Sequence, residues 1–338
     1  MRQGFRAFAV GLALVALLGL VPAGPARAKD VVVIYTALEN EQITDYKRLY
    51  EKALPNLDIK MLRLSTGDIA ARFMAEKANM QADVIWGVAA TNMLIFKNEG
   101  MLEPYAPKGL DRIQALFRDK ANPPAWVGID IYMSAFCVNT EASKKHNLPM
   151  PTGWADLTKP VYKGHLVMPN PASSGTGYLS VVSVLQRMGE AEGWKYLDAL
   201  DKNMAEYTKS GSKPCKDAGT GERAIGISFE YVAQAMKKGG SPVEMVLPKE
   251  GAGYEMEANA LTKRGRTNAA AKQFLDWAIS DEAMGLYATY WAAVAVPGFP
   301  VPEGLPKDIS KVVYPNDFDW SAKNRDRILA EWQKRYAK

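Results

Sequence analysis

Three apolar, strand-like segments alternate with helix-like segments between residues 31 and 100, and this alternation restricts the fold more than any other feature. The segment 31–36 is rich in β-branched residues, as a strand covered on both faces requires. Further strands are expected over 57–64 and 82–86. Strand, helix, strand, helix, strand predicts a parallel sheet with crossover helices, in which ligands bind beyond the carboxyl ends of the strands.

The turns after these three strands carry side chains that suit a ligand. Tyr35 and Glu39 follow the first strand, and Trp86 lies near the end of the third. Ser65 and Thr66 follow the second strand and directly precede an amphipathic segment. A helix N-terminus offers unpaired N–H donors and a partial positive charge, so this turn could bind an anion.

The segment 170–177, Asn-Pro-Ala-Ser-Ser-Gly-Thr-Gly, repeats this chemistry in the second half of the chain. It follows an apolar run at 166–168 and precedes a helical pattern at 178–188, which indicates strand, tight turn and helix start. The turn offers three hydroxyls and a flexible backbone: Ser173, Ser174, Thr176 and Gly175. We expect an anion site that needs no cationic side chain, and the alternative is an ordinary helix N-cap.

A long extended run at 126–139 divides the two alternations and suits a hinge between domains. The 338 residues exceed one typical core, so two α/β lobes are expected, each with a mixed, mainly parallel sheet flanked by helices. Strands at 243–247 and 257–261 are expected to return to the first lobe. The predicted division is 29–128 plus 259–300 for lobe one and 129–258 plus 301–338 for lobe two, with a ligand cleft between them.

Residues 1–28 have the pattern of a secretory signal peptide. An uncharged apolar run covers 8–21, and Ala-Arg-Ala at 26–28 is a small-x-small cleavage site. The apolar run of about 14 residues is shorter than the roughly 20 that a spanning helix needs. We therefore expect export to the bacterial periplasm, with a mature chain that starts near Lys29.

The charge balance gives no case for a nucleic-acid partner. The chain has 42 Lys+Arg and 37 Asp+Glu, and three of the arginines lie within residues 1–28. The exported part is therefore nearly neutral and has no basic tail, whereas nucleic-acid binding calls for a basic patch.

Enzyme and metal motifs are not found in the sequence. The two histidines, His146 and His165, do not neighbour a nucleophile motif, and no Gly-x-Ser-x-Gly, Walker or His-Glu-x-x-His pattern occurs. Cys137 and Cys215 are too far apart for a local metal pair; they could form a disulfide in an oxidising compartment or stay unpaired. We expect no catalytic residue, no metal and no cofactor.

Glutamates at two of the turns indicate that the ligand also carries a cation. Glu39 and Glu230 would disfavour an anion unless its other end were positive. Three aromatic side chains at the same turns could pack against a short linker or an ammonium: Tyr35, Trp86 and Tyr231. Ser210 is a further candidate. The alternatives are that each glutamate is a solvated surface acid and that Trp86 packs in the core.

Several segments spread through the chain together resemble a known family. They are Tyr-Thr-Ala-Leu-Glu (35–39), Ser-Thr-Gly (65–67), Ala-Asp-Val-Ile-Trp-Gly (82–87), Gly-Trp-Ala-Asp-Leu (153–157), Pro-Asn-Pro-Ala-Ser-Ser-Gly-Thr-Gly (169–177), Ser-Gly-Ser-Lys-Pro-Cys (210–215) and Gly-Ile-Ser-Phe-Glu-Tyr (226–231). The chain resembles the solute-binding proteins of bacterial ABC importers, in the ferric/thiamine-like branch. The last two segments resemble the 2-aminoethylphosphonate-binding members in particular.

The resemblance implies a two-lobed, type II-like periplasmic-binding-protein fold and a monomer that delivers its ligand to a membrane permease without chemistry on it. It implies that the phosphonate is bound by Ser65, Thr66, Ser173, Ser174, Gly175 and Thr176. The amine end and walls would be Glu39, Tyr35, Trp86, Ser210, Glu230 and Tyr231. Ferric-ion binders of the same branch place adjacent tyrosines where this chain has Glu230-Tyr231, so iron is an alternative with one tyrosine missing. A periplasmic enzyme on the same fold is a second alternative.

Overall fold

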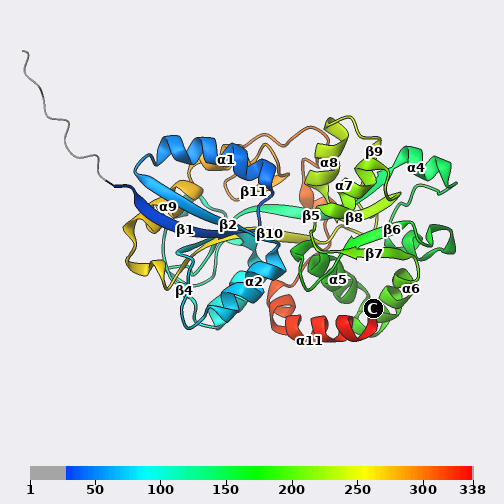
Figure 1. Ribbon diagram of the computed structural model, residues 1–338, viewed down its shortest axis with the longest axis horizontal. Helices are drawn as coiled ribbons and strands as arrows, with labels where there is room; N and C mark the ends of the chain where they lie inside the picture. Colours follow the sequence, from blue (N-terminus) through cyan, green and yellow to red (C-terminus); the bar gives the residue numbers. More distant parts are fainter. Residues whose placement is uncertain (1–27, 337–338) are drawn as a thin grey trace, which may run out of the picture.

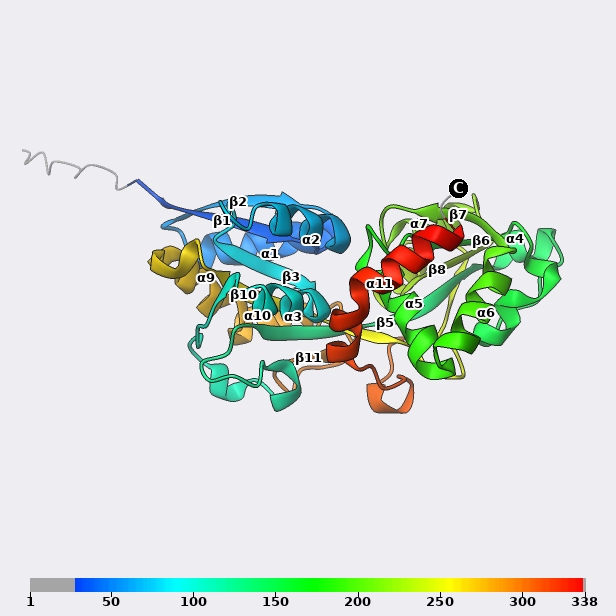
Figure 2. The same cartoon turned by 90° about the horizontal axis from the view of Figure 1, so that it is seen from below.

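The computed structural model describes residues 28–336 and shows two lobes built on a mixed sheet (Figures 1 and 2). The strand order is β2-β1-β3-β10-β5-β8-β6-β7, with β4, β9 and β11 beside this path. The predicted signal peptide lies outside the described residues. Within residues 28–336, no helix combines the length and apolar character needed to cross a membrane.

Strands of the first lobe are β1 (Asp30–Thr36), β2 (Leu57–Arg63), β3 (Val84–Ala89), β4 (Leu102–Glu103), β10 (Tyr254–Thr262) and β11 (Ala293–Val294). Strands of the second lobe are β6 (Leu166–Pro169), β7 (Met204–Thr208), β8 (Ile225–Phe229) and β9 (Val243–Val246). β5 (Val127–Asn139) belongs to both. β1 pairs in parallel with β2 and β3, and β6 pairs in parallel with β7 and β8, which confirms the predicted alternations.

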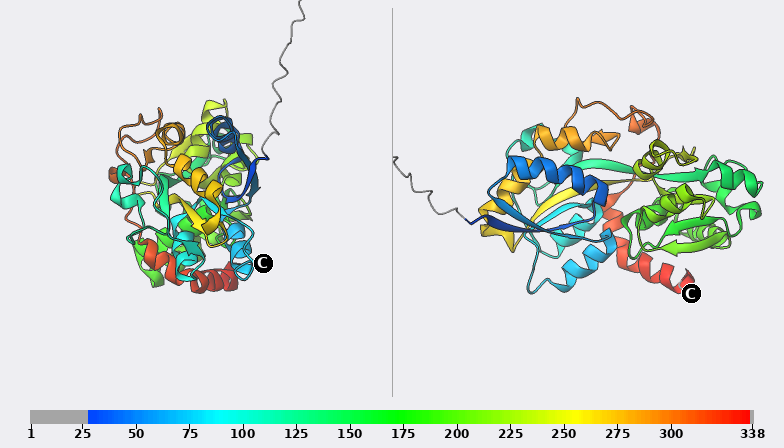
Figure 3. Two further views of the ribbon diagram at one scale, coloured as in Figure 1. Left: turned by 90° about the vertical axis from the view of Figure 1, so that its left-hand side faces the viewer. Right: turned by 45° about the horizontal axis from the view of Figure 1, so that its top comes forward.

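Helices cover both faces of each sheet (Figure 3). The first five along the chain are α1 (Asn40–Ala53), α2 (Thr66–Ala75), α3 (Ala90–Asn98), α4 (Thr140–Lys145) and α5 (Gly175–Met188). The remainder are α6 (Glu190–Asp201), α7 (Lys213–Thr220), α8 (Glu230–Lys238), α9 (Ala269–Ala278), α10 (Asp281–Tyr287) and α11 (Phe318–Tyr336). Short 3₁₀ turns are η1 (Leu110–Arg112), η2 (Ala115–Phe117), η3 (Trp154–Thr158), η4 (Pro160–Tyr162), η5 (Gly265–Thr267) and η6 (Ile309–Lys311).

β5 connects the lobes, as the long extended run predicts. Its first half, up to Met133, pairs with β10, and its second half, from Ser134, pairs with β8. All 13 residues of β5 are buried, because both of its faces are covered in each lobe. β5 and β10 together therefore form the connection across which one lobe meets the other (Figure 2).

The predicted return of 243–247 to the first lobe is wrong. β9 pairs with the Phe136–Asn139 end of β5 in the second lobe, on the edge of β5 opposite β8. An apolar alternation identifies a strand, but partner choice depends on which long strand still has a free edge nearby. β10 does return to the first lobe and pairs with β3 and β4, as expected. The exact residues at which the chain passes between lobes stay a prediction.

Each lobe has its own apolar core. In the first lobe, Ile34, Phe73, Trp86 and Phe274 are fully buried in one cluster. In the second lobe, Trp154, Leu166 and Ile225 pack with the C-terminal helix α11 through Ile328 and Trp332. Cys137 of β5 and Cys215 of α7 form a disulfide, which decides the pairing that the sequence left open.

Candidate functional site

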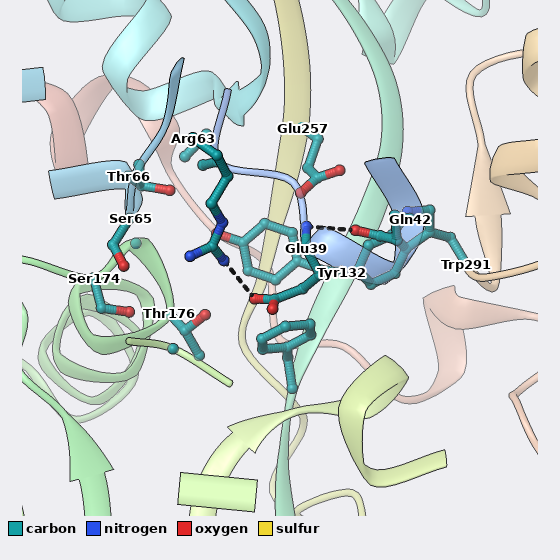
Figure 4. A pocket seen from close by; sticks show the side chains of 15 residues that line it. Glu39, Gln42, Arg63, Ser65, Thr66, Tyr132, Ser174, Thr176, Glu257 and Trp291 are labelled. Carbon is teal, nitrogen blue, oxygen red and sulfur yellow. Dashed lines mark hydrogen bonds and ion pairs between the residues drawn. The ribbon is translucent and has the colours of Figure 1, made fainter. Parts of the chain in front are cut away.

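A pocket lies between the lobes, with about 490 Å³ of space not filled by protein atoms when the open solvent at its mouth is included (Figure 4). Its lining comes from strand ends and helix starts of both lobes. The lining residues are Ala37, Glu39, Gln42, Arg63, Ser65, Thr66, Ala89, Tyr132, Ser174, Gly175, Thr176, Gly211, Phe229, Glu257 and Trp291. The pocket therefore occupies the place beyond the strand ends that the alternation predicts.

Two helix N-termini, one from each lobe, meet at the hydroxyl-rich end of the pocket. The backbone N–H of Gly67 in α2 donates to the carbonyl oxygen of Ser173 before α5, at 2.9 Å. The approach requires a glycine at 175, because a Cβ there would lie 2.9 Å from Thr66 Oγ1. The lobes are thus in contact here, and free N–H groups of both helices can be aimed at one anion.

Four hydroxyls lie together at this end (Figure 4). Ser65 is the N-cap of α2 but its side chain makes no capping hydrogen bond, so the hydroxyl is available to a ligand. Ser174 is the N-cap of α5, and its Oγ accepts from the Gly177 N–H at 3.2 Å. Gly211 closes this end, because a Cβ there would lie 2.6 Å from Thr176 Oγ1. Short polar side chains at two helix starts are a suitable environment for a tetrahedral oxyanion.

The turns do not line the pocket alone, because Arg63 at the end of β2 also lines it. Whether an anion needs this cation stays a prediction. The Nη2 of Arg63 lies 3.1 Å from Glu39 Oε1, and its Nε donates to the Leu38 carbonyl oxygen. From the second lobe, Ser212 Oγ donates to Glu39 Oε2 at 3.1 Å and Lys216 Nζ lies 3.7 Å from it. The Glu39 carboxylate is therefore already compensated by the protein.

The opposite end of the pocket is acidic and aromatic. Glu257 of β10 and Tyr132 of β5 line it together with Phe229 and Trp291. The Glu257 side chain is only 9% exposed, and desolvation raises its pKa well above the ordinary range for a carboxyl. A positive group on a ligand would find an uncompensated acid here.

Half of the predicted ligand residues line the pocket: Glu39, Ser65, Thr66, Ser174, Gly175 and Thr176. The structure brings them together from turns more than 100 residues apart. Their individual contacts with a ligand stay predictions. Two predicted hydroxyls are engaged elsewhere, since Ser173 Oγ donates to the Lys209 carbonyl oxygen and Ser210 Oγ lies 3.1 Å from Ser212 Oγ.

Two aromatic side chains predicted at the ligand are placed in the first-lobe core instead. Trp86 is fully buried, its Nε1 donates to the Tyr287 hydroxyl, and its ring packs against Phe274. Tyr35 is 2% exposed, and its hydroxyl donates to Glu76. Successive strand residues face opposite sides of the sheet, so a place near a strand end does not say which side a side chain takes.

Glu230 and Tyr231 also lie outside the pocket lining, which corrects their predicted place at the amine. Glu230 is fully buried at the start of α8, where its Oε2 accepts from the Met133 N–H at 2.7 Å. Burial raises the pKa of Glu230 to about 8. Tyr231 packs against the rings of Tyr290 and Trp291, so Trp291 stands between it and the pocket.

Sequence reasoning missed the remaining polar and aromatic lining: Gln42, Arg63, Tyr132, Phe229, Glu257 and Trp291. Arg63 had a usable signal, because it lies one residue before the end of the predicted strand 57–64 and two residues before Ser65. Glu257 and Tyr132 had none, since they lie within strands whose pairing is not encoded locally. Among the described residues, no cluster of three or more histidine, cysteine, aspartate or glutamate side chains is arranged to hold a metal ion.

Comparisons with known proteins agree with this geometry. Residues 79–323 match the family model described as bacterial extracellular solute-binding protein. An uncharacterized protein of Haemophilus influenzae (strain ATCC 51907 / DSM 11121 / KW20 / Rd) is 36% identical over 274 residues, which cover 79% of this chain and 78% of that protein. A probable ABC transporter periplasmic-binding protein, y4fP of Sinorhizobium fredii (strain NBRC 101917 / NGR234), is 27% identical over 279 residues, or 78% of this chain and 75% of the relative.

A solved structure extends the likeness to the whole fold. The periplasmic binding protein AfuA from Actinobacillus pleuropneumoniae, with exogenous fructose-6-phosphate bound, superimposes with a TM-score of 0.84 at 30% sequence identity. The superposition covers 92% of this chain and 99% of AfuA. The two-lobed architecture, the pocket between the lobes and the matched family model lead to one conclusion: this chain belongs to the bacterial extracellular solute-binding protein family.

Proposed function

We propose that this protein captures 2-aminoethylphosphonate in the periplasm and delivers it, chemically unchanged, to the membrane permease of an ABC importer. The matched family, y4fP and AfuA are described as binding proteins, which supports a role without catalysis. The predicted signal peptide supports export, and the proposed working form is a monomer that closes its lobes over the ligand.

The observation that carries the choice of ligand is the opposite chemistry of the two ends of one pocket. Hydroxyls, two helix N-termini and the Arg63 guanidinium lie at one end. Glu257 lies at the other end, beside Tyr132 and Trp291. A small molecule with an oxyanion head and a cationic tail satisfies both ends at once, whereas a plain anion would face an uncompensated acid.

The hydroxyl-rich end suits the phosphonate group. Backbone N–H groups at a helix start bind phosphate-like anions, and a guanidinium strengthens such a site through charge-assisted hydrogen bonds. The aromatic rings at the other end suit the two-carbon linker and the ammonium, since a cation is attracted to a ring face. Ser65, Thr66, Ser174, Gly175 and Thr176 would bind the phosphonate, and Arg63 would balance its charge.

A phosphorylated sugar is the second candidate, and the likeness to AfuA favours it. AfuA holds fructose-6-phosphate in its solved structure and shares 30% of its sequence with this chain. The same hydroxyl-rich end would accept a phosphate ester. A neutral sugar would leave the Glu257 carboxyl without a positive partner, which is why we place the zwitterion first. Ferric ion is a third candidate of the same branch.

Calorimetric titration of the ligand-stripped, full exported chain tests the proposal. The panel is 2-aminoethylphosphonate, ethylphosphonate, inorganic phosphate, fructose-6-phosphate and ferric citrate. We expect the amino compound to bind at least about a hundredfold more tightly than ethylphosphonate, which has the same head without the amine. Equal or tighter binding of fructose-6-phosphate would replace the zwitterion by a sugar phosphate, and binding of ferric citrate alone would place the protein among the iron binders.

A further inference from the structure

Two carboxyl side chains stand directly opposite each other at the acidic end of the pocket. Asp130 of β5 and Glu257 of β10 are register partners in an antiparallel pair, and the register shifts directly after Glu257. Side chains at opposite positions have Cβ atoms roughly 4.5–5.5 Å apart, so the two carboxyl groups adjoin. Asp130 is fully buried behind Glu257, and Glu257 lines the pocket.

The protein supplies no counter-charge to this pair. Among the described residues, the two carboxyl groups hydrogen-bond only to each other: no other group bonds to either oxygen of Asp130 or to Oε2 of Glu257. Glu39, in the same pocket, differs because Arg63 and Lys216 neutralise it. Glu255, two residues before Glu257 and equally buried, is bonded by the Thr91 hydroxyl and the Met256 N–H.

The other groups around the pair add negative charge or none. Some of these groups affect the pKa of Asp130 or Glu257 through their charge, and the charge of the pair affects the pKa of others. They are Glu39 before α1, Tyr46 in α1, Tyr132 in β5, Glu230 in α8 and Tyr287 in α10. No lysine or arginine of the described chain offsets the pair, because Arg63 and Lys216 are directed to Glu39.

Without a counter-charge, two adjoining carboxyls in a desolvated site cannot both be ionised at neutral pH. Burial and the mutual repulsion of Asp130, Glu257 and Glu230 raise the pKa of the pair well above the ordinary range. Such a pair titrates as a unit, and a proton that it retains is shared by the pair rather than assigned to one residue. In the ligand-free protein, that retained proton takes the place of a counter-charge.

We propose that Glu257, supported by Asp130, is the subsite for the ligand's ammonium group, and that the entering ammonium displaces the proton held by the pair. The proposal rests on the function proposed above and deepens it. The proton is released to solvent, the ammonium keeps its own protons, and no covalent bond other than the O–H bond is broken. The pair then selects for a cationic tail, because a neutral tail cannot replace the proton.

The exchange makes affinity depend on pH with a definite sign. Each ligand bound releases one proton wherever the empty pair is protonated, so affinity for 2-aminoethylphosphonate rises as pH rises. The affinity rises by at most about tenfold per pH unit, and it stops rising above the raised pKa of the pair. Ionisation of the ligand's own phosphonate also contributes to the pH dependence of affinity, but this contribution is the same in wild-type protein and in variants at the acidic end.

The test is calorimetric titration of the full exported chain with 2-aminoethylphosphonate at pH 7, in buffers of different ionisation enthalpy. Wild-type protein is compared with Glu257→Gln and with the matched control Glu255→Gln. We expect wild type and Glu255→Gln to release close to one more proton than Glu257→Gln does. The preference for 2-aminoethylphosphonate over ethylphosphonate should fall at least about tenfold in Glu257→Gln.

Infrared difference spectroscopy on wild-type protein provides a readout that does not depend on a variant folding. The difference spectrum should show the loss of carboxylic-acid C=O absorption from one group when 2-aminoethylphosphonate binds, and no such loss when ethylphosphonate binds. Binding of 2-aminoethylphosphonate with equal proton release in wild type and Glu257→Gln, or with the acid band intact, would overturn this inference alone. Failure of every phosphonate to bind would overturn the proposed function and this inference together.

Discussion

The hydroxyl-rich end of the pocket and its acidic end satisfy their polar groups in different ways. At the first end, Ser174 has a hydrogen-bond partner in its own helix, and Arg63 and Glu39 pair with each other. At the second, Asp130 and Glu257 are buried side by side, and among the described residues they bond only to each other, with no cationic partner. Unpaired buried charge is costly, so the first end is stable without a ligand, whereas the second is improved by a ligand that is positive.

The comparison predicts which substitutions lower the affinity for every phosphonate and which lower it only for a phosphonate that also carries an ammonium group. Changes at the hydroxyl-rich end should lower affinity for 2-aminoethylphosphonate and ethylphosphonate alike. Changes at the acidic end should alter the preference between them. A residue outside both ends, even a predicted one, should alter stability alone.

Arg63→Gln should have the largest effect. The change removes the only lysine or arginine side chain that residues 28–336 place in the pocket lining, and it leaves Glu39 with fewer partners, close to where an anion would bind. Because charge-assisted hydrogen bonds contribute roughly 1.5–3 kcal/mol each, we expect Kd to rise at least about a hundredfold for both phosphonates. Calorimetric titration measures this, with Arg48→Gln, an exposed arginine of α1, as the control. A change below about threefold would remove Arg63 from the site.

The double variant Ser174→Ala, Thr176→Ala should follow, with a loss of affinity of more than about tenfold for both phosphonates. Both hydroxyls line the pocket and both side chains are nearly buried, so their loss removes hydrogen bonds without opening the fold. Ser183→Ala, in the same helix but outside the pocket lining, is the matched control. If only the amino compound lost affinity, the two ends would be assigned the wrong way round.

The acidic end should also make the ligand-free protein less stable as pH rises. The pKa of Glu230 is raised to about 8 and those of Asp130 and Glu257 are raised well above their ordinary values. Between the ordinary pKa of a carboxyl and these raised values, the folded protein binds more protons than the unfolded chain. The contribution of these carboxyls to the free energy of unfolding is therefore fully present at about pH 4–5 and is lost toward pH 8. The loss is up to about 1.4 kcal/mol for each extra proton bound and each pH unit.

Thermal unfolding of the ligand-free protein from pH 5 to pH 8.5 measures this loss. Tm should fall as pH rises, and Glu257→Gln should show a shallower slope because one titrating group is gone. Saturating 2-aminoethylphosphonate should also reduce the slope. A Tm that rises steadily over this range would show that the pair is not protonated in the folded protein.

Trp86→Phe should have the smallest effect on binding. Trp86 is fully buried among aromatic side chains of the first lobe and bonds to Tyr287, away from the pocket lining. We expect the free energy of unfolding to fall by about 1–3 kcal/mol in denaturant titrations, with Kd changed less than about twofold. A tenfold loss of affinity with unchanged stability would show that Trp86 contacts the ligand, as the sequence analysis predicts.

Local patterns were sufficient for the fold and for one end of the pocket. The alternation of strands and helices between residues 31 and 100 predicts the parallel order of β1, β2 and β3. Ser65 and Ser174 were found because each lies at a strand-to-helix turn, where the residues that shape the turn are also those that face a ligand. Such signals are contained within a few neighbouring residues, so they can be read without knowing the tertiary fold.

The acidic end was decided by tertiary structure alone. Asp130 and Glu257 are far apart in sequence and meet only because β5 and β10 pair in one particular register. The same pairing problem misplaced β9, and the choice of sheet face misplaced Trp86. The sequence by itself determined which segments become strands and helices and which turns carry hydroxyls, since these depend on local chemistry. Register, sheet face and the partners of buried charges depend on contacts between distant segments, and only the folded chain decides them.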